Sequence, residues 1–365
     1  MDHLRTALTM LVIVFHTSIA YGAAGSWILV DVDTSKLTIT SILLTIFTAV
    51  CQAFFMGLFF FLSSYFIPAS YERKGAGRFI KDRLIRLGIP LVFYCFVIGP
   101  ITGWFAHFRD RQSLTEFYHI EVWSFKQIFV GPAWFLEALL YFVILYTTFR
   151  LIRGKRAAVQ SERPFPKNLT LLAAAVGIGF VAFVVRFVYP TGQGPLGLQF
   201  GYFPLYFLLF IVGLLAYRYN WIPQIPARTV KIWGWVAVCA IPVLPVGLIL
   251  TGALEGNMTF AGGLNVQALV YAFWEPFICI GMILILLRLF QKHLHRSNPL
   301  RKWMSANAYT VYIIHPPVIV GWTIFMTNFI WPPAIKWLLV SLLSIICCFL
   351  LSAILRAIPG ARRIL

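Results

Sequence analysis

The sequence has little charge for its length. Only 12% of its 365 residues are charged, whereas 60% are hydrophobic and 17% are aromatic. A soluble domain carries about 25% charged residues, which cover its water-facing surface. No long polar stretch marks a boundary between domains either. The composition therefore excludes a soluble protein and predicts one membrane-embedded domain over 1–365, with the lipid bilayer as its main solvent.

Acidic residues are especially scarce, because 12 Asp and Glu face 30 Lys and Arg and leave a net charge of +18. Such a charge is also typical of nucleic-acid binding, but that function needs a basic face on a soluble fold. Here the basic residues occur in short runs between apolar stretches. We therefore expect no nucleic-acid partner, and we interpret the charge as a signal that orients membrane loops.

Cysteine and histidine patterns that bind metals are absent. The sequence has six cysteines, no CxxC motif and no His-rich tract. All six cysteines fall inside apolar segments, which is typical of buried small side chains. We therefore predict no metal site and no disulfide framework. The cysteines are Cys51, Cys95, Cys239, Cys279, Cys347 and Cys348.

Long apolar runs dominate what is present. A transmembrane helix needs about 20 mainly apolar residues, and ten segments of the chain satisfy this requirement. They lie at 7–24, 39–67, 87–108, 128–149, 169–189, 197–217, 232–254, 264–287, 308–330 and 337–355. The sequence therefore predicts an all-α, polytopic integral membrane protein.

The basic residues alternate between the loops. Loops 68–86, 150–168, 218–231 and 288–307, together with the C-terminal tail, hold 23 of the 30 Lys and Arg. The opposite loops hold Lys36, Arg109, Arg111, Lys126 and Lys336. By the positive-inside rule, both termini are predicted to be cytoplasmic. Arg186 lies near the outer boundary, where its side chain can reach the interface, so we assign it no chemistry.

The first segment has two interpretations. Arg5, an apolar core and the small residues of 20–24 also fit a cleavable signal peptide. A discarded peptide would not need the polar residues that this segment carries, so we interpret it as the first transmembrane helix. The chain ends about ten residues after the last apolar segment, so we expect no fused extracytoplasmic domain.

Three polar residues on this first helix are the most informative feature. Arg5 and His16 are eleven residues apart, which is three turns plus about 20°, so both lie on one face. His16 is about 16 Å deeper than Arg5 and hence near the bilayer centre, and Asp2 lies one turn before Arg5. Ionisable groups at such depth usually face a cavity or a partner. A neutral, hydrogen-bonded His16 with Arg5 as a cytoplasmic anchor is the alternative.

Other ionisable residues also fall within apolar segments. Glu275 lies near the middle of the eighth segment, Glu137 lies in the fourth, and His315 precedes Pro316 and Pro317 in the ninth. We expect the two prolines to interrupt that helix and to free backbone carbonyls. Glu275 and His315 are secondary candidates for catalysis. For Glu137 and His315 we favour a structural or supporting role, whereas for Glu275 a catalytic and a structural role are about equally compatible with the sequence.

Asp2, Arg5 and His16, together with four later sequence blocks, resemble in order the motifs of the acyltransferase type 3 family of membrane O-acyltransferases. The opening matches Asp2-x-x-Arg5 followed by His16, and the later blocks of the family appear in order along the whole chain. One departure is Ser64, where the family usually has Gly. The subgroup that resembles glucan biosynthesis protein C, a succinyl transferase, is a candidate relative. The later blocks are Phe59–Phe66 (FFFLSSYF), Phe79–Leu87 (FIKDRLIRL), Ala133–Leu136 (AWFL) and Tyr309–His315 (YTVYIIH).

The resemblance implies transfer of an acetyl or succinyl group from cytoplasmic acyl-CoA to a hydroxyl of an extracytoplasmic or lipid-linked carbohydrate. Such transfer needs a base and a positive group for the oxyanion. His16 is the candidate base, and Arg5 is expected to support the donor or the oxyanion. We expect acyl-CoA to be a substrate rather than a resident cofactor, and the bacterial inner membrane to be the location.

The same resemblance assigns the CoA phosphates to the basic run before the third segment. Arg83 and Arg86 lie one turn apart, and the guanidinium group is well shaped to bind phosphate oxygens through two hydrogen bonds. Arg78 and Lys81 are weaker candidates for the same role. The alternative is that all four are topological signals, because any cytoplasmic loop is expected to be basic.

Two other classes of protein fit some of these features. A secondary transporter of a small polar or anionic solute would also carry intramembrane Glu, His and Arg and proline-broken helices. The prolines that could break helices are Pro242, Pro245, Pro276, Pro316 and Pro317. However, the two halves of the chain show no convincing repeat. The other class is a scaffold protein that contributes its membrane domain to a complex, but this function does not explain why Arg5 and His16 share a face.

Overall fold

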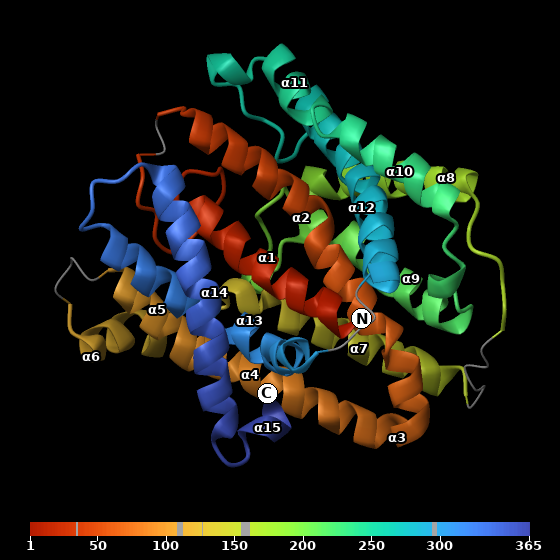
Figure 1. Ribbon diagram of the computed structural model, residues 1–365, viewed down its shortest axis with the longest axis horizontal. Coiled ribbons are helices and arrows are strands. Elements are labelled where there is room, and N and C mark those ends of the chain that lie inside the picture. Colours follow the sequence, from red (N-terminus) through yellow and green to blue (C-terminus); the bar gives the residue numbers. More distant parts are fainter. Residues whose placement is uncertain (34–35, 108–111, 126, 155–160, 294–297) are drawn as a thin grey trace. The chain divides into compact units, whose positions relative to one another are not determined.

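The computed structural model describes residues 1–365 except 34–35, 108–111, 126, 155–160 and 294–297. In this part of the chain every regular element is a helix and no strand occurs (Figure 1). Within the described residues, ten helical segments are long and apolar enough to cross a membrane, so the predicted all-α, polytopic architecture is confirmed. The segments are Asp2–Ala20, Ile39–Tyr65, Ile67–Ala106, Gly131–Ile152, Asn168–Val188, Phe200–Arg218, Ala227–Leu250, Val266–Lys292, Pro299–Met326 and Pro333–Ala357.

The region 68–86 is helical, and our expectation of a loop there is wrong. It forms α3 (Ile67–Arg83), which bends at Gly75, where φ is 70°. Lys, Arg and Glu are good helix formers, so a charged sequence does not by itself end a helix. The helical run continues through η1 (Leu84–Gly88), α4 (Ile89–Phe93), η2 (Tyr94–Ile98) and α5 (Gly99–Ala106), of which η1 and η2 are π-helical.

The chain divides into two compact units. The terminal unit comprises Asp2–Ala49, Lys81–Leu140 and Ser297–Leu365, and the central unit comprises Met1, Val50–Ile80 and Tyr141–Arg296. Of the described helices, three contribute residues to both units: α2 (Ile39–Tyr65), α3 (Ile67–Arg83) and α7 (Trp134–Ile152).

The terminal unit is built around three helices that pack on one another, α1 (Asp2–Ala20), α13 (Pro299–Met326) and α14 (Pro333–Ala357). Small polar side chains connect α1 to α14. The hydroxyls of Thr17 and Ser341 lie 2.6 Å apart. Such hydrogen bonds between helices stabilise packing in lipid, where apolar burial between helices gains little. The remaining short elements are α6 (Leu114–Phe117), η4 (Tyr118–Trp123), η5 (Gly131–Ala133) and α15 (Ala361–Ile364).

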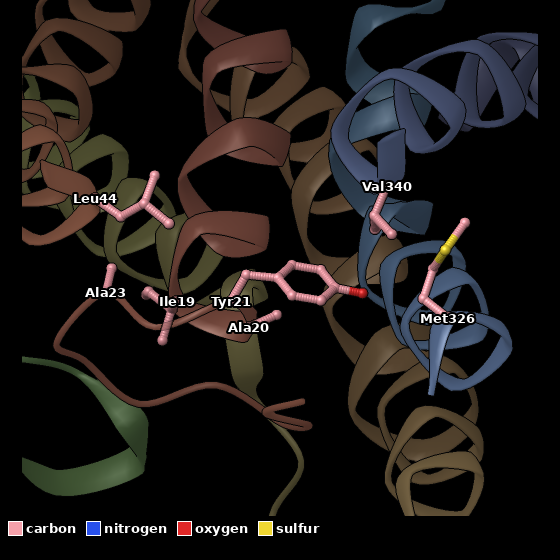
Figure 2. Packing of buried hydrophobic residues seen from close by; sticks show 7 residues of the cluster. All are labelled: Ile19, Ala20, Tyr21, Ala23, Leu44, Met326 and Val340. Atoms are coloured by element: carbon pink, nitrogen blue, oxygen red, sulfur yellow. The ribbon is translucent and has the colours of Figure 1, made fainter. Parts of the chain in front are cut away.

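A buried apolar cluster closes the end of α1 against α13 and α14. In Figure 2 the ring of Tyr21 extends from the end of α1 toward the helices that carry Met326 and Val340. The large aromatic ring is almost fully buried and fills the space between the three helices. Ile19, Ala20, Ala23 and Leu44 complete the cluster.

The central unit packs α12 (Val266–His293) against α8 (Asn168–Val188) and α10 (Ala227–Ala240). The packing of this unit also shows how the side chain of Ser64, which is fully buried on α2, is accommodated. A Cβ at Gly213 would lie 2.0 Å from the Ser64 hydroxyl, so glycine at 213 provides the space that serine at 64 needs. The other elements are η6 (Pro195–Gly197), η7 (Phe200–Tyr202), α9 (Phe203–Arg218), η8 (Ile222–Gln224), α11 (Val243–Leu250) and η9 (Ala253–Glu255).

The prolines have different effects in different helices. A break does occur at Pro242, which separates α10 from α11. By contrast, α13 continues through Pro316 and Pro317, so the expected interruption is wrong. Proline is tolerated inside a membrane helix when other donors satisfy the carbonyl that it leaves free. Such a donor is present in α13.

Candidate active site

Two histidines from distant parts of the chain meet in the terminal unit. Nδ1 of His16 on α1 lies 3.1 Å from Nε2 of His315 on α13. Their rings are nearly parallel, with centroids 5.1 Å apart and an interplanar angle of 12°. His315 is fully buried, and His16 is half-buried. The main and the secondary candidate from the sequence are therefore direct hydrogen-bond partners.

The sequence around His315 sets its orientation. Pro316 has no N–H, so the carbonyl of Tyr312, four residues earlier, loses its helical hydrogen bond. Nδ1 of His315 lies 2.5 Å from this carbonyl oxygen. A carbonyl only accepts hydrogen bonds, so Nδ1 of His315 carries the proton. This is how the helix passes through the prolines without an unsatisfied carbonyl at Tyr312.

The proton positions of the pair follow from this assignment. In a neutral His315 protonated at Nδ1, Nε2 is an acceptor. His16 Nδ1 must then be the donor across the 3.1 Å contact. In a neutral His16 protonated at Nδ1, the lone pair lies on Nε2. The backbone carbonyl of Tyr312 thus determines, through His315, which nitrogen of His16 can accept a proton.

His16 lies close to one end of its helix. α1 begins at Asp2 and ends at Ala20, so only one further turn follows His16. The segment after α1 folds back over this end, and the Trp27 indole stacks on His16 with ring centroids 4.1 Å apart and an interplanar angle of 19°. Trp27 was not a candidate from the sequence, because nothing in the sequence shows which part of a loop folds back.

Arg5 lies at the opposite end of α1. It forms an ion pair with Asp2, at 3.6 Å between Arg5 Nη1 and Asp2 Oδ1. Eleven residues of helix separate Arg5 from His16, which corresponds to about 16 Å along the axis. The shared face predicted from the sequence is compatible with α1, but the two side chains lie at different ends of it.

A basic cluster surrounds Arg5 in the terminal unit. Arg83, the last residue of α3, lies within electrostatic range of Arg5, Arg86 and Asp82. Arg86 is likewise within range of Arg356 near the end of α14. The cluster of Arg5, Arg83, Arg86 and Arg356, which we call the arginine cluster, thus combines three segments that are far apart in the sequence.

Tyr309 of α13 connects this helix to the arginine cluster through a hydrogen bond. Its hydroxyl donates a hydrogen bond to the carbonyl of Arg86. Pro90, four residues after Arg86, lacks the N–H that would occupy this carbonyl in an α-helix. A proline and a side-chain donor are therefore paired here in the same way as at His315. The two weaker candidates, Arg78 and Lys81, are exposed on α3.

The remaining candidate from the sequence, Glu275, belongs to the central unit. Arg186 on α8 donates a hydrogen bond to its carboxylate from Nη2, and both side chains are buried, with exposed fractions of 0% and 2%. The Arg186 guanidinium also lies 4.8 Å from the ring centroid of Tyr271 and 5.4 Å from that of Tyr202. The expectation that Arg186 extends to the membrane interface is wrong, because a carboxylate and two aromatic rings hold it inside.

Glu137 is buried in the first turn of α7, within electrostatic range of Cys95. Among the residues that the structure describes, no three His, Cys, Asp or Glu side chains gather in a way that could hold a metal ion. Three basic residues of the predicted loops, Arg109, Arg111 and Lys126, lie outside the described residues.

A polytopic helical protein in which His16, near the end of α1, pairs with the buried His315 of α13 is consistent with a membrane-embedded transferase. Residues 1–353 match the acyltransferase domain family, the type 3 acyltransferases. The chain belongs to this family, and it is a membrane acyltransferase.

The chain is also similar to curated proteins, at low sequence identity. Over 236 residues the chain is 25% identical to the glucans biosynthesis protein C of Escherichia coli O6:K15:H31 and to that of Escherichia coli K12. The match covers 60% of this chain and 57% of the relatives. The matched region thus spans little more than half the length of these relatives. No solved structure matches the chain.

Proposed function

We propose that this acyltransferase moves an acetyl or succinyl group from acyl-CoA to a hydroxyl of an extracytoplasmic or lipid-linked carbohydrate, with His16 as the general base. The observation that carries the proposal is the hydrogen-bonded chain from the Tyr312 carbonyl through His315 to His16. The name of the relatives in Escherichia coli is compatible with a glucan as one acceptor of this class.

The chain of hydrogen bonds gives His16 the properties of a base. Its Nε2 holds the lone pair, and its Nδ1 donates to His315. When Nε2 takes a proton, the ring becomes positive, and the hydrogen bond to His315 becomes charge-assisted and stronger. His315 therefore acts as a positioning residue, in the way that a third group orients the base of a catalytic triad.

The reaction proceeds by attack of the acceptor oxygen on the thioester carbon. His16 Nε2 removes the hydroxyl proton as the new C–O bond forms and the carbonyl oxygen becomes an oxyanion. The C–S bond then breaks, the carbonyl re-forms, and the proton held by His16 passes to the thiolate. The products are the carbohydrate ester and CoA, and no oxidant, reductant or metal is consumed.

The arginine cluster is the proposed site for the donor phosphates. Arg83 and Arg86 can each bind phosphate oxygens through two hydrogen bonds. Arg5 joins them because it lies within electrostatic range of Arg83, whereas about 16 Å of helix separate it from His16. Of the two roles expected for Arg5, the geometry supports the donor role. The pantetheine arm of CoA would extend along α1 toward the histidine pair.

This arrangement fits the topology predicted from the charges. With the N-terminus in the cytoplasm, the arginine cluster lies on the side that supplies acyl-CoA, and His16 lies toward the outer side. The chain would then accept the donor from one face of the bacterial inner membrane and the carbohydrate from the other face.

A direct assay tests the proposal. Purified protein in detergent is incubated with acetyl-CoA or succinyl-CoA and with envelope glycan from cells that lack the protein, and released thiol and glycan mass are measured together. We expect thiol release to equal the gain of ester mass on the glycan, and both to be lost with His16→Gln. If well-folded wild-type protein releases no thiol from either acetyl-CoA or succinyl-CoA, the proposed function is contradicted.

A further inference from the structure

The segment that follows α1 is fixed at several points, although it is a loop. The N–H of Asp31 donates to the carbonyl of Ala20 at 2.9 Å, and the N–H of Ala24 donates to the Thr45 hydroxyl at 2.9 Å. The Asp31 carboxylate also forms an ion pair with Nζ of Lys336 on α14, at 2.7 Å. Lys336 is only 7% exposed, so this pair is shielded from solvent and from screening by salt. The loop is therefore held in one place.

These contacts hold the Trp27 indole over the base. Trp27 packs against the buried cluster around Tyr21 and stacks on His16 at 4.1 Å. The indole is also nearly parallel to the ring of His315, with centroids 6.4 Å apart and an interplanar angle of 15°. Trp27 thus belongs to the same group of rings as the histidine pair.

The indole N–H of Trp27 is buried and has no hydrogen-bond partner among the described residues. A buried donor without an acceptor is destabilising, and buried Trp N–H groups usually find a partner. By comparison, Trp337, which packs against the same cluster, donates its N–H to the Ser18 hydroxyl at 3.0 Å. The indole N–H groups of Trp221 and Trp233 are also buried without a partner among the described residues, but Trp27 is stacked on the candidate base, so its unused donor is placed to serve an acceptor that arrives with the substrate.

We propose that Trp27 is a further catalytic residue, whose indole N–H donates a hydrogen bond to the acyl carbonyl oxygen as it becomes an oxyanion. The proposal rests on the proposed acyl transfer. The indole N–H is a donor only and cannot take up a proton, so it can bind the oxyanion without competing with His16 as base. Arg5 cannot serve at this position, because about 16 Å of helix separate it from His16.

The two groups divide the step between them. His16 Nε2 takes the hydroxyl proton while the acceptor oxygen bonds to the thioester carbon. The negative charge develops on the carbonyl oxygen, where the indole N–H stabilises it. When the C–S bond breaks, the charge leaves the oxygen with the thiolate, and the carbonyl of the new ester no longer needs the donor. Donors positioned in advance in a low-dielectric site act strongly on such charge.

The test replaces the N–H while keeping the ring. Trp27→Phe retains an aromatic ring for the stack on His16 and removes the donor. We expect kcat to fall about 10²–10³-fold, as for loss of one oxyanion donor, with little change in KM for acyl-CoA. Trp322→Phe is the matched control, because Trp322 packs against the same cluster; it should keep near wild-type kcat. Rates are measured with acetyl-CoA or succinyl-CoA and the unacylated envelope glycan.

The pH profile separates this role from a purely structural one. The acidic limb of kcat/KM reports the free base, so it should keep its midpoint in Trp27→Phe if the indole acts on the oxyanion. A shifted midpoint with unchanged limiting kcat would overturn the proposal, because Trp27 would then act only by packing on His16. So would a Trp27→Phe enzyme that retains more than about a tenth of wild-type kcat.

A second variant covers the case in which Trp27→Phe folds poorly. β-(3-Benzothienyl)alanine at position 27 keeps the bicyclic shape and replaces the N–H by sulfur, so it removes only the donor. The same loss of kcat is expected. If the wild-type protein transfers acyl groups but this variant does so at full rate, the role of Trp27 is refuted and the acyl transfer stands. If the folded wild-type protein transfers nothing, both proposals fail.

Discussion

The carbonyl oxygen of Tyr312 accepts a hydrogen bond from Nδ1 of His315 at 2.5 Å. Pro316 makes this possible, because it has no N–H to occupy that carbonyl. A proline thus determines the tautomer of one histidine, and that histidine determines the tautomer of the next, His16, at 3.1 Å. Backbone chemistry in α13 thereby selects the nitrogen of α1 that can act as a base.

This relationship predicts a graded effect of substitutions at His315. His315→Leu removes the acceptor for His16 Nδ1, so the His16 proton can move to Nε2 and the base is lost. We expect kcat to fall by about 10²-fold or more, because the wrong tautomer of a catalytic histidine is severely inactivating. His315→Gln can still offer an oxygen to His16 Nδ1 and should retain more activity. The measurement is kcat together with ¹⁵N NMR of the His16 ring nitrogens.

An equal loss in both variants would contradict this role for His315, as would a His315→Leu enzyme in which His16 remains protonated at Nδ1. Folded yield and thermal stability are compared in parallel, because His315 is fully buried and its replacement also affects packing.

His16 itself is predicted to be essential for transfer but not for folding. A positioned general base contributes about 10²–10⁴-fold to the rate. His16→Gln should therefore lose measurable transfer while it keeps normal expression and thermal stability, since His16 is only half-buried. A folded variant that retains more than about a tenth of the wild-type rate would shift the chemistry to Glu275 or His315.

The sequence was sufficient for features that depend on one segment at a time. Ten apolar runs predicted ten spans, and helical spacing placed Arg5 and His16 on one face of α1. It was insufficient where a partner comes from elsewhere in the chain. Nothing in the periodicity of α1 indicates that His16 meets His315, 299 residues away, and the family resemblance included His315 only as the last residue of a motif, without its contact.

The errors have a common physical origin. The expected break at Pro316 and the expected extension of Arg186 to the interface both left out a side-chain partner inside the protein. In both cases another side chain satisfies the group inside the protein: His315 bonds the freed carbonyl of Tyr312, and Glu275 pairs with Arg186. Partners that lie 89 residues apart, as Arg186 and Glu275 do, cannot be identified from local patterns.

The arginine cluster gives a prediction about the donor. Arg83→Ala and Arg86→Ala should each weaken binding of acyl-CoA while membrane insertion stays normal. Arg83→Lys should rescue poorly, because an ammonium group cannot form the paired hydrogen bonds of guanidinium. Arg73→Ala removes one exposed positive charge from the same helix α3 and is the control. Binding is measured by calorimetry with a non-hydrolysable acyl-CoA analogue.

Unchanged affinity in both alanine variants would reduce the pair to topological signals. A salt dependence shared by Arg73→Ala, Arg83→Ala and Arg86→Ala would likewise indicate attraction by net charge rather than a specific site.

The predicted orientation can be tested with single cysteines at exposed positions. A Cβ at Gly77 on α3 would meet no atom within 4 Å, and Glu162 is exposed. Cysteines at these two positions should be protected from a membrane-impermeant thiol reagent in intact spheroplasts, because both lie in basic segments. Met258→Cys, at a 52% exposed residue, should be labelled. Labelling of either basic segment before lysis would overturn the predicted topology.

The final prediction separates structure from catalysis at Glu275. Removing one member of a buried ion pair leaves the other charge uncompensated and costs about 3–5 kcal/mol, whereas replacing both with apolar residues is often neutral. Arg186→Met and Glu275→Leu should therefore each destabilise the protein strongly, and the double variant should recover much of the loss. Glu72→Gln is the control, since the Glu72–Arg150 pair is partly exposed, with a Glu72 side-chain exposure of 40%, and such pairs contribute about 0–1 kcal/mol.

Unfolding is followed in detergent, and acyl transfer is measured on the same samples. If the double variant is both stable and active, Glu275 serves the fold alone. If it is stable but inactive, the Arg186–Glu275 pair is needed for the reaction, and the role of general base must be reconsidered between Glu275 and His16.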